Sequence, residues 1–392
     1  MNVLFLTHAF PREVEDPAGS FILRLAVALA GEGVAATVVA PHAPGLPERE
    51  TLCDVPVRRF RYAPERYETL AYAGTMAEQV RASWAARLAL GGLLASAVHS
   101  ADRQRKEVRA QLLHAHWWFP GGLAAAAVST VRRLPLVTTL HGSDVRLASS
   151  IAGARPVFAR VAARSNVVTA VSTWLASQAS ALAPGAPAPR VAPMPADVML
   201  FSPDGPRAQN RLLFVGRLTP QKGVDLLLRA LAELPHDVSL DVVGAGIEAE
   251  ALQRLAVSLD VAVRVRWHSP VRQSRLADFY RAATALVVPS VEEGLGLVAV
   301  EALLCETPVV AFDSGGLRDV VLDGETGVLV RSISATAMAT AVNSLLRRPD
   351  RGASLGRAGR ARALEAFAPE AAARRYLAIY HEAIRHFQDR QS

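Results

Sequence analysis

Short apolar runs alternate with helical patterns from one end of the chain to the other, and the alternation comes in two series. The first series runs from VLFLTH (3–8) to NVVTAVS (166–172), and the second runs from RLLFVG (211–216) to TGVLV (326–330). Near-continuous apolar strands with helical crossovers are typical of parallel sheets that are covered by helices on both faces. The sequence therefore predicts an α/β protein with two similar doubly wound, Rossmann-like domains in tandem.

The length of 392 residues suits two domains, and the composition indicates where they meet. The region 182–210 is rich in Pro, Ala and Gly, and its polar end at 203–210 predicts a linker. We therefore expect an N-terminal domain at 1–203 and a C-terminal domain at 204–369. A helix at 370–392 is expected to cross back and join the first domain. In sheets of this kind, ligands bind beyond the carboxyl ends of the strands.

The composition also excludes several classes of protein. Cys53 and Cys305 are far apart and form no CxxC pair, which excludes a disulfide framework or a thiolate zinc site and favours a reducing, cytoplasmic compartment. The run MNVLFLTHAF lacks a charged start and a cleavage-site pattern, so it predicts a buried strand and not a signal peptide. No apolar stretch is long enough to span a bilayer. The charges that sum to +7 are scattered, which argues against nucleic acid but suits an anionic membrane surface or phosphorylated substrates.

The segment 76–110 differs from its neighbours because it predicts one long helical run, broken at Gly91–Gly92. Trp84, Leu88 and further leucines lie there among several arginines. Two interpretations remain open. The segment is either a crossover helix that faces the core with a solvated basic flank, or an interfacial helix that docks on anionic lipid.

Two cations follow the first strand of the second series. Arg217 and Lys222 lie in the loop RLTPQKG, just before an expected helix. Two positive charges beside the N–H groups at the start of a helix would make a good binding site for a diphosphate. Gly244, in VVGAG, gives a G-x-G pattern that is weak evidence alone. No Asp-x-Asp pair is present for a divalent cation, so the two basic side chains would have to neutralise the phosphates without metal.

Two glutamates stand eight residues apart in VEEGLGLVAVEAL (291–303). Gly294 and Gly296 allow a tight turn and a close approach of backbone to a ligand, which would present Glu293 at the mouth of a binding site. Glu301 lies in an apolar stretch that should be buried. A buried carboxylate without partners is costly, so Glu301 is expected to have a partner or a ligand.

Histidines follow two strands of the first series. His141 comes directly after a strand in TTLHGSD, and we interpret it as a functional residue. His114 and His116, in QLLHAHWW, could suggest a metal ion, but no third ligand adjoins them. Packing or contacts with an acceptor are therefore favoured for this pair. Gly19 is expected to begin the first helix of this domain.

The quoted motifs, taken together, carry a resemblance to a known family. FVGRLTPQKG, VVGAG, VPSVEEGLGLVAVEAL, TPVVAFDSGGLRDVV and DGETGVLV follow one another in that order. In this order and spacing the chain resembles the retaining glycosyltransferases of the GT-B fold, of the family four or group 1 type. The resemblance covers essentially the whole chain. It implies two Rossmann-like domains that face each other across a cleft.

The resemblance also implies roles for the matching positions. Arg217 and Lys222 would bind the diphosphate of a nucleotide sugar, and Glu301 would accept hydrogen bonds from the ribose. The sugar hydroxyls would be held by Glu293 and by the backbone of the loop that follows it, while His141 would contact the sugar near its anomeric carbon. The implied donor-binding set is Gly19, Arg217, Lys222, Gly244, Glu293, Gly294, Leu295, Gly296, Leu297 and Glu301. The implied catalytic set is His141, Arg217, Lys222 and Glu293.

The reaction implied by the resemblance is transfer of a sugar from a nucleotide sugar, with UDP as the preferred base, to a hydroxyl acceptor with retention at the anomeric carbon. The acceptor would be a glycan, a lipid-linked molecule or a small molecule in polysaccharide or glycolipid synthesis. No cofactor and no metal ion are expected, and the location would be the cytoplasm, with peripheral contact to the inner face of the membrane. A sugar-nucleotide epimerase of the same fold is the nearest alternative. A nicotinamide-dependent oxidoreductase is disfavoured because no G-x-G-x-x-G follows the first strand.

Overall fold

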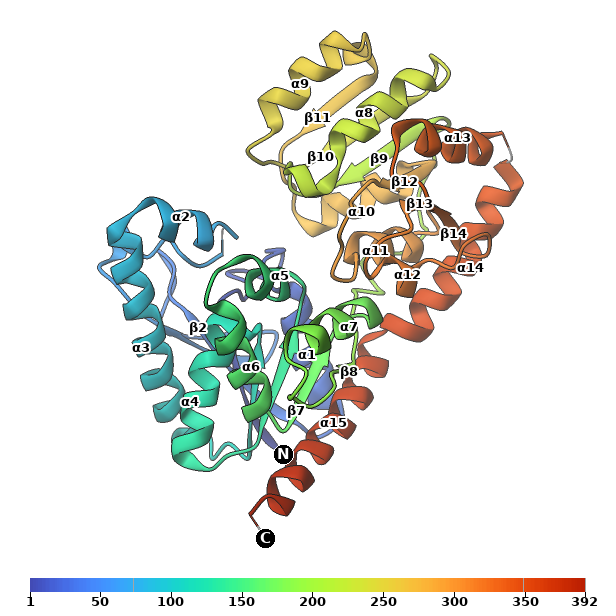
Figure 1. Cartoon of the computed structure of the whole chain (residues 1–392). Helices are drawn as coiled ribbons and strands as arrows, with labels where there is room; N and C mark the ends of the chain where they lie inside the picture. Colours follow the sequence, from blue (N-terminus) through green and yellow to red (C-terminus); the bar gives the residue numbers. More distant parts are fainter. Residues whose placement is uncertain (73, 348, 392) are drawn as a thin grey trace. The chain divides into compact units, whose positions relative to one another are not determined.

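Each series of strands forms one sheet, as Figure 1 shows. The computed structural model describes residues 1–72, 74–347 and 349–391, without the side chains of 349–351. The chain divides into an N-terminal unit, Met1–Pro195 with Pro369–Ser392, and a C-terminal unit, Ala196–Ala368. Both units are α/β structures. The sheet of the C-terminal unit is parallel throughout, and that of the N-terminal unit is parallel apart from one edge strand. The predicted α/β class is confirmed.

The N-terminal unit holds an eight-stranded sheet in the order β3-β4-β2-β1-β5-β6-β7-β8. Its strands are β1 (Asn2–Leu6), β2 (Ala35–Pro41), β3 (Arg49–Leu52), β4 (Val55–Phe60), β5 (Leu112–His116), β6 (Leu136–Leu140), β7 (Val167–Ala170) and β8 (Arg190–Val191). Only β3 is antiparallel to its neighbour, and it forms one edge of the sheet. Every residue of β5, β6 and β7 is buried, as expected for strands covered on both faces.

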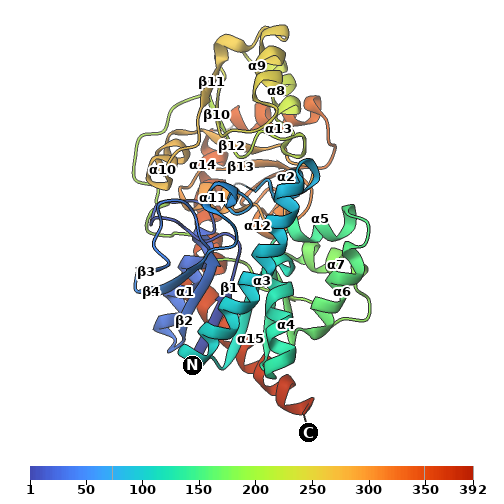
Figure 2. The same ribbon diagram turned by 90° about the vertical axis from the view of Figure 1, so that its left-hand side faces the viewer.

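Helices cover both faces of this sheet. They are α1 (Ser20–Gly31), α2 (Met76–Ala82), α3 (Trp84–Glu107), α4 (Leu123–Arg132), α5 (Ser143–Ser150), α6 (Ala154–Arg164), α7 (Thr173–Leu182) and α15 (Pro369–Asp389). Figure 2 shows α3 beside α4 on one face, while α15 packs on α1 and on β6 and β7. The helix at the end of the chain thus belongs to the N-terminal unit, and residue 392 of the predicted helix lies outside the described residues.

The break in the segment 76–110 was predicted at the wrong place. The backbone leaves helical geometry at Ser83, between α2 and α3, whereas Gly91 and Gly92 lie inside α3. Gly92 serves close packing instead, because a Cβ atom there would overlap the carbonyl oxygen of Tyr62. Helix α3 buries Leu93 and a row of alanines and so faces the core, as one of the two interpretations expected.

The C-terminal unit holds a six-stranded parallel sheet in the order β11-β10-β9-β12-β13-β14. Its strands are β9 (Arg211–Val215), β10 (Ser239–Val243), β11 (Val265–His268), β12 (Ala285–Val288), β13 (Val309–Phe312) and β14 (Gly327–Val330). The strand order reverses between β9 and β12, and such a switch point is where doubly wound sheets bind ligands.

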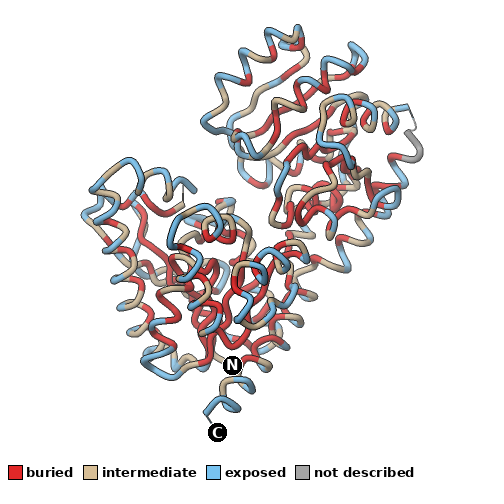
Figure 3. Tube along the Cα trace, viewed as in Figure 1, coloured by how far each residue is buried: buried red, intermediate tan, exposed pale blue. Residues whose placement is uncertain are grey.

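The helices of the C-terminal unit also lie on both faces of its sheet. They are α8 (Val224–Glu233), α9 (Ala249–Ser258), α10 (Gln273–Ala282), α11 (Leu297–Leu304), α12 (Leu317–Val320), α13 (Ala335–Leu346) and α14 (Pro349–Phe367). Helices α8, α9 and α13 cover one face, and α10, α11 and α14 cover the other. Figure 3 shows the strands of each unit as its buried centre. Among the described residues, no helix is both long enough and apolar enough to cross a lipid bilayer.

Candidate functional site

The loops that follow β9 and β12 meet at the switch point of the second sheet. Gly223, which precedes α8, has a φ of 64°, and a Cβ atom there would overlap the carbonyl oxygen of Pro289. The backbone N–H of Val291 donates to the carbonyl of Gln221 over 3.2 Å. Only glycine allows this approach together with this backbone angle. The two loops therefore form one surface.

An ion pair joins the two loops. The Lys222 ammonium, at the end of a short 3₁₀ turn (Pro220–Lys222), contacts Oε1 of Glu293. Both side chains are largely shielded, with exposed fractions of 21% for Lys222 and 11% for Glu293. Arg217 lies on the same loop as Lys222 and is exposed. The structure therefore brings a cation and a carboxylate of the predicted site into contact, with a second cation on the same loop.

Two further loops support this surface. The loop after β10 carries Gly244, whose N–H donates to the carbonyl of His268 over 2.9 Å. Leu218, beside Arg217, donates its N–H to the carbonyl of Ala245 over 2.9 Å. In the loop after β13, the N–H of Gly316 donates to the carbonyl of Glu293 over 2.8 Å. Backbone hydrogen bonds thus hold both charged loops from either side.

Glu301 has the partner that its burial requires. Gly296 begins α11 with a φ of 89°, and Glu301 follows on that helix with only 9% of its surface exposed. The hydroxyl of Tyr280, a fully buried residue of α10, donates to Oε2 of Glu301 over 2.8 Å. Burial and the Glu301 charge raise the pKa of Tyr280 well above its usual value, so the phenol keeps the proton that it donates. Tyr280 cannot be found from the sequence, since no pattern links α10 to this carboxylate.

The predicted donor residues of the C-terminal unit are therefore distributed over neighbouring loops. Lys222 and Glu293 touch, while Gly294 to Leu297 continue from Glu293 into α11. Gly244 lies on an adjoining loop, and Glu301 lies on the second turn of α11. Gly19 and His141 belong to the N-terminal unit.

In the N-terminal unit, Asp144 fixes the loop that carries His141. Its carboxylate accepts hydrogen bonds from the backbone N–H groups of His141 (3.1 Å), Gly142 (2.9 Å) and Trp118 (3.2 Å). Burial raises the pKa of Asp144, and these hydrogen bonds oppose that rise. Asp144 thus acts on His141 through its backbone.

The His141 ring lies in an aromatic cluster. Its Nε2 is 3.2 Å from Nδ1 of His116, and its ring centroid is 4.4 Å from that of Trp117. His114, two residues before His116, bonds instead to the hydroxyls of Thr139 (2.7 Å) and Tyr380 (2.8 Å). The contact between His116 and His141 joins two strand ends and has no signal in the sequence.

Burial keeps these histidines neutral. It lowers the pKa of His114 to about 3 and that of His8 to about 4, and it lowers those of His116 and His141 well below the usual value. Nearby histidines add to the effect, because each disfavours a second positive charge. Among the described residues, no group of three or more His, Cys, Asp and Glu side chains is placed to hold a metal ion.

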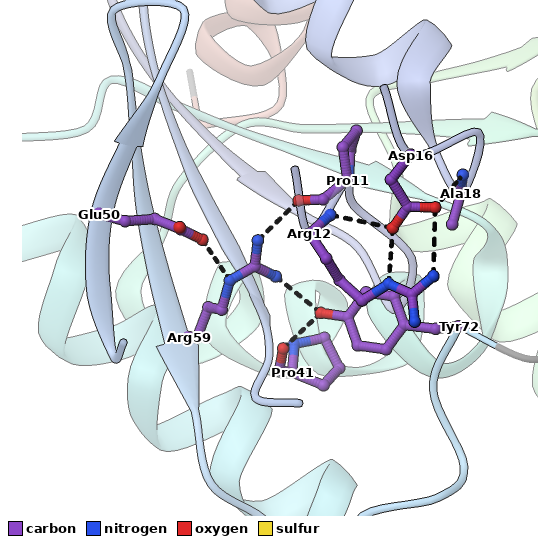
Figure 4. Close-up of polar contacts among 8 residues, drawn as sticks. All are labelled: Pro11, Arg12, Asp16, Ala18, Pro41, Glu50, Arg59 and Tyr72. Atoms are coloured by element: carbon purple, nitrogen blue, oxygen red, sulfur yellow. Dashed lines mark hydrogen bonds and ion pairs between the residues drawn. The ribbon is translucent and has the colours of Figure 1, made fainter. Parts of the chain in front are cut away.

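Gly19 begins α1 with a φ of 74°, at the end of a loop that a polar network holds in place. In Figure 4, Asp16 accepts hydrogen bonds from the backbone N–H groups of Arg12 and Ala18 and pairs with the Arg12 guanidinium at 2.6 Å. The fully buried guanidinium of Arg59 donates to the carbonyl of Pro11 over 2.6 Å and also contacts Tyr72 and Glu50, both of which are labelled in the same view.

Two family models match the chain. The model described as "Glycosyltransferase Family 4" matches residues 18–198, and the model described as "Glycosyl transferases group 1" matches residues 201–362. Among solved structures, the sucrose-phosphate synthase of Thermosynechococcus elongatus superposes with a TM-score of 0.79 at 24% identity, over 97% of this chain and 99% of that one. Anabaena HepE, solved with UDP and glucose, superposes with a TM-score of 0.76 at 20% identity, over 97% and 99%. These likenesses, with the two parallel sheets, show a GT-B fold.

Relatives in sequence show the family of the chain. D-inositol 3-phosphate glycosyltransferase 2 of Catenulispora acidiphila is 40% identical over 276 residues, which are 62% of this chain and 64% of that protein, just under two thirds of its length. The D-inositol 3-phosphate glycosyltransferase of Frankia alni is 37% identical over 70% of this chain and 74% of that protein. The chain belongs to the family 4, group 1 glycosyltransferases.

Proposed function

We propose that this protein transfers a sugar from a nucleoside diphosphate sugar to a hydroxyl acceptor, with retention at the anomeric carbon and without a metal ion. The observation that supports this most is the Lys222–Glu293 ion pair at the switch point between β9 and β12. A cation and a carboxylate side by side suit a ligand that carries phosphate at one end and sugar hydroxyls at the other. Membership of the glycosyltransferase family supports the same activity.

The diphosphate would be bound by Arg217 and Lys222. The N-terminus of α11, which begins at Leu297 after Gly296, adds positive potential at the same loop. When the bond between the sugar and the diphosphate breaks, negative charge grows on the leaving group. Fixed donors that meet such growing charge commonly contribute about 10²- to 10³-fold each in rate. The two side chains would thus do the work that a divalent cation does elsewhere.

The nucleoside and the sugar would be bound on either side of the diphosphate. Glu301, oriented by Tyr280, would accept hydrogen bonds from the ribose hydroxyls. Glu293 and the backbone from Gly294 to Leu297 would hold hydroxyls of the sugar, and His141 would contact the sugar near its anomeric carbon. UDP is the preferred nucleotide of the donor, and the solved complex of HepE with UDP-glucose supports that choice. GDP is the second nucleotide to test, because a relative from Mycolicibacterium smegmatis is named a GDP-mannose-dependent mannosyltransferase.

The chemical step would be a substitution on one face of the sugar. The bond from the anomeric carbon to the diphosphate oxygen breaks, and the acceptor oxygen forms its bond to the same carbon from the same side. The acceptor proton passes to an oxygen of the departing diphosphate, which balances the charge. No carboxylate is assigned as a covalent nucleophile in this scheme. A neutral His141 would donate or accept a hydrogen bond without adding charge near the developing cation.

The acceptor would be bound by the N-terminal unit. The names of the relatives make D-inositol 3-phosphate the first acceptor to test, followed by lipid-linked and glycan hydroxyls. We place the enzyme in the cytoplasm, in surface glycan or glycolipid synthesis. Peripheral membrane contact would use the exposed side chains of Trp84 and Leu88, which lie one turn apart on α3 beside the exposed Arg81 and Arg87.

A donor and acceptor screen tests the proposal. The protein is incubated with UDP-, GDP- and ADP-sugars and the acceptors above in EDTA, and products are detected by mass spectrometry. We expect a glycosylated acceptor and a released nucleoside diphosphate, and the NMR coupling of the anomeric proton should match that of the donor. An altered nucleotide sugar formed without any acceptor would favour the epimerase. An inverted product would contradict retention.

A further inference from the structure

His116 touches the one histidine of the N-terminal unit that the proposed function uses. It is the last residue of β5, a fully buried strand, and its backbone is in register with Thr139 of β6. Its Nδ1 lies 3.2 Å from Nε2 of His141. Since His116 is 0% exposed and sits on a central strand, it has little freedom to turn away.

The hydrogen bond between the two rings requires one proton. Both imidazoles are neutral at neutral pH, so each carries a single N–H. Either His116 donates from Nδ1 to His141, or His141 donates from Nε2 to His116. In the first arrangement, the second proton of the pair lies on Nδ1 of His141. In the second arrangement, it lies on Nε2 of His116.

The surroundings of His116 favour the first arrangement. Its other ring nitrogen, Nε2, is buried and has no hydrogen-bond partner among the residues that the structure describes. If His141 donated, the proton of His116 would lie on that Nε2 and become a buried N–H without an acceptor. Buried N–H groups without a partner are rare in proteins, whereas an acceptor that lacks one is tolerated more often. His116 is therefore the donor, and its Nε2 keeps an unused lone pair.

The first arrangement determines which atom of His141 meets a ligand. With its Nε2 accepting from His116, His141 carries its own proton on Nδ1. Within the described residues, Nδ1 of His141 has no hydrogen-bond partner, and the residue is partly exposed. The ring is held in this orientation by Trp117 at 4.4 Å and Phe21 at 5.1 Å between centroids.

We propose that His116 is a positioning residue, which holds His141 in the Nδ1–H tautomer so that His141 donates a hydrogen bond to an oxygen of the bound sugar. The inference rests on the proposed function for its ligand, but the tautomer itself is a property of the protein alone. A donor with a fixed position would hold the sugar in the orientation that the reaction needs, so its effect should fall mainly on turnover.

Imidazole ¹⁵N NMR tests the tautomer directly. Long-range ¹H–¹⁵N spectra of histidine-labelled full-length protein distinguish protonated from unprotonated ring nitrogens, and the spectrum of His141→Asn assigns the His141 signals. We expect Nδ1 of His141 to be protonated in the wild type, and His116→Leu to move His141 toward the Nε2–H form. A wild-type His141 that is protonated on Nε2, or a tautomer unchanged in His116→Leu, would overturn the proposal.

Kinetics separate positioning from general stability. His116→Leu should lower kcat about tenfold or more while changing the donor KM little. His116→Asn, whose amide can offer an N–H near the position of Nδ1, should recover part of that loss. The control is Thr139→Val, which removes a partner of His114 in the same buried cluster and should leave both the His141 tautomer and kcat close to wild type. Wild-type kcat in folded His116→Leu would overturn the role.

Failure of the proposed function and failure of the positioning role give different results. If the wild type transfers no sugar but shows the Nδ1–H form of His141, the proposed function is wrong and the hydrogen-bond assignment stands. If transfer occurs and His141 carries its proton on Nε2, the function stands and the positioning role is wrong. Should His116→Leu not fold, His116→Asn and the wild-type spectrum still decide the tautomer.

Discussion

At the scale of single residues, the charged side chains of the site have protein partners. Lys222 is paired with Glu293, and Glu301 accepts a hydrogen bond from Tyr280, so these contacts help to orient each side chain. An incoming diphosphate would compete with the Glu293 carboxylate for the Lys222 ammonium. Phosphate oxygens can win this competition because their hydrogen bonds to an ammonium group are charge-assisted and strong.

Glu301 and Tyr280 should differ in how strongly they affect donor binding. Glu301→Ala removes the carboxylate that is proposed to bind the ribose, and the donor KM should rise about 10- to 100-fold, as expected for hydrogen bonds to a charged group. Tyr280→Phe only removes the group that orients it, so the rise should be smaller, with kcat little changed in both. Steady-state kinetics with varied donor checks this. A larger effect from Tyr280→Phe than from Glu301→Ala would contradict the assignment.

His141 should affect turnover more than binding. His141→Ala removes a neutral hydrogen-bonding group near the reacting carbon, and kcat should fall at least about tenfold while the donor KM changes little. Asp144 holds the backbone of the same loop but not the ring. Rapid-quench measurements of a single turnover can be compared between wild type and variant, and an unchanged rate of the chemical step would remove the role of His141.

At the scale of elements, the site depends on loops that lock onto one another at strand ends. The loop after β9 packs on the end of β12 through Gly223, and the loop after β13 holds the backbone of Glu293. Such contacts arise because parallel strands all end at the same edge of a sheet. The chemistry is therefore placed by backbone geometry as much as by side chains.

Gly223 provides a test of this interlocking. Gly223→Ala should lose stability and activity together, because the methyl group meets the Pro289 carbonyl and the φ of 64° is unfavourable. Gly33→Ala is the matched control, since Gly33 has a φ of 73° but open space around it. That variant should pay only the strain of a left-handed residue, about 1–2 kcal/mol. Urea unfolding and donor kinetics on both would check this, and equal losses would argue against the packing role.

The elements that the sequence predicted are those specified by local pattern. Apolar runs predict the buried strands. Turn residues at fixed spacing predict the loops that carry Arg217, Lys222 and Glu293. The structure places these loops side by side because the strand order reverses between β9 and β12. The pair Gly91–Gly92 predicts a helix break that lies at Ser83 instead. Glycine can indicate either a bend or close packing against another backbone segment, and the sequence alone does not distinguish the two.

The residues that the sequence did not reveal act through contacts between distant segments. Tyr280 reaches Glu301 from another helix, and His116 reaches His141 from a neighbouring strand, 25 residues away. Arg59 supports the loop before Gly19 from β4, which is separated from β1 by β2 in the sheet. Each has an ordinary residue type in an ordinary pattern, so only the folded chain shows what it contacts.

At the scale of the whole molecule, buried histidines couple stability to pH. The unfolded chain binds a proton at His114 below a pKa of about 6.5, but the folded chain does so only near pH 3. Its contribution to stability is therefore fully present above pH 6.5 and is lost as the pH falls toward 3. The slope should reach about 1.4 kcal/mol per pH unit for each such group.

Unfolding by urea between pH 7 and pH 4 measures this coupling. His114→Gln should reduce the loss of stability on acidification relative to wild type, because glutamine takes up no proton in either state. His99→Gln, at an exposed position of α3 in the same unit, should leave the pH profile unchanged. A profile of His114→Gln that runs parallel to that of the wild type would show that burial of this imidazole does not set the acid sensitivity.

We propose that the loops at the β9–β12 switch point bind a nucleoside diphosphate through Arg217 and Lys222. Isothermal titration with UDP, GDP, ADP and NAD in EDTA measures this most directly. The wild type should bind at least one of the three diphosphates, with UDP preferred. Arg217→Ala/Lys222→Ala should weaken that binding about 100-fold or more. The charge-matched control Arg229→Ala/Lys106→Ala, at exposed positions on the helices α8 and α3, should bind like the wild type. Binding of NAD alone, or unchanged diphosphate affinity in Arg217→Ala/Lys222→Ala, would show that these loops are not a nucleoside diphosphate site.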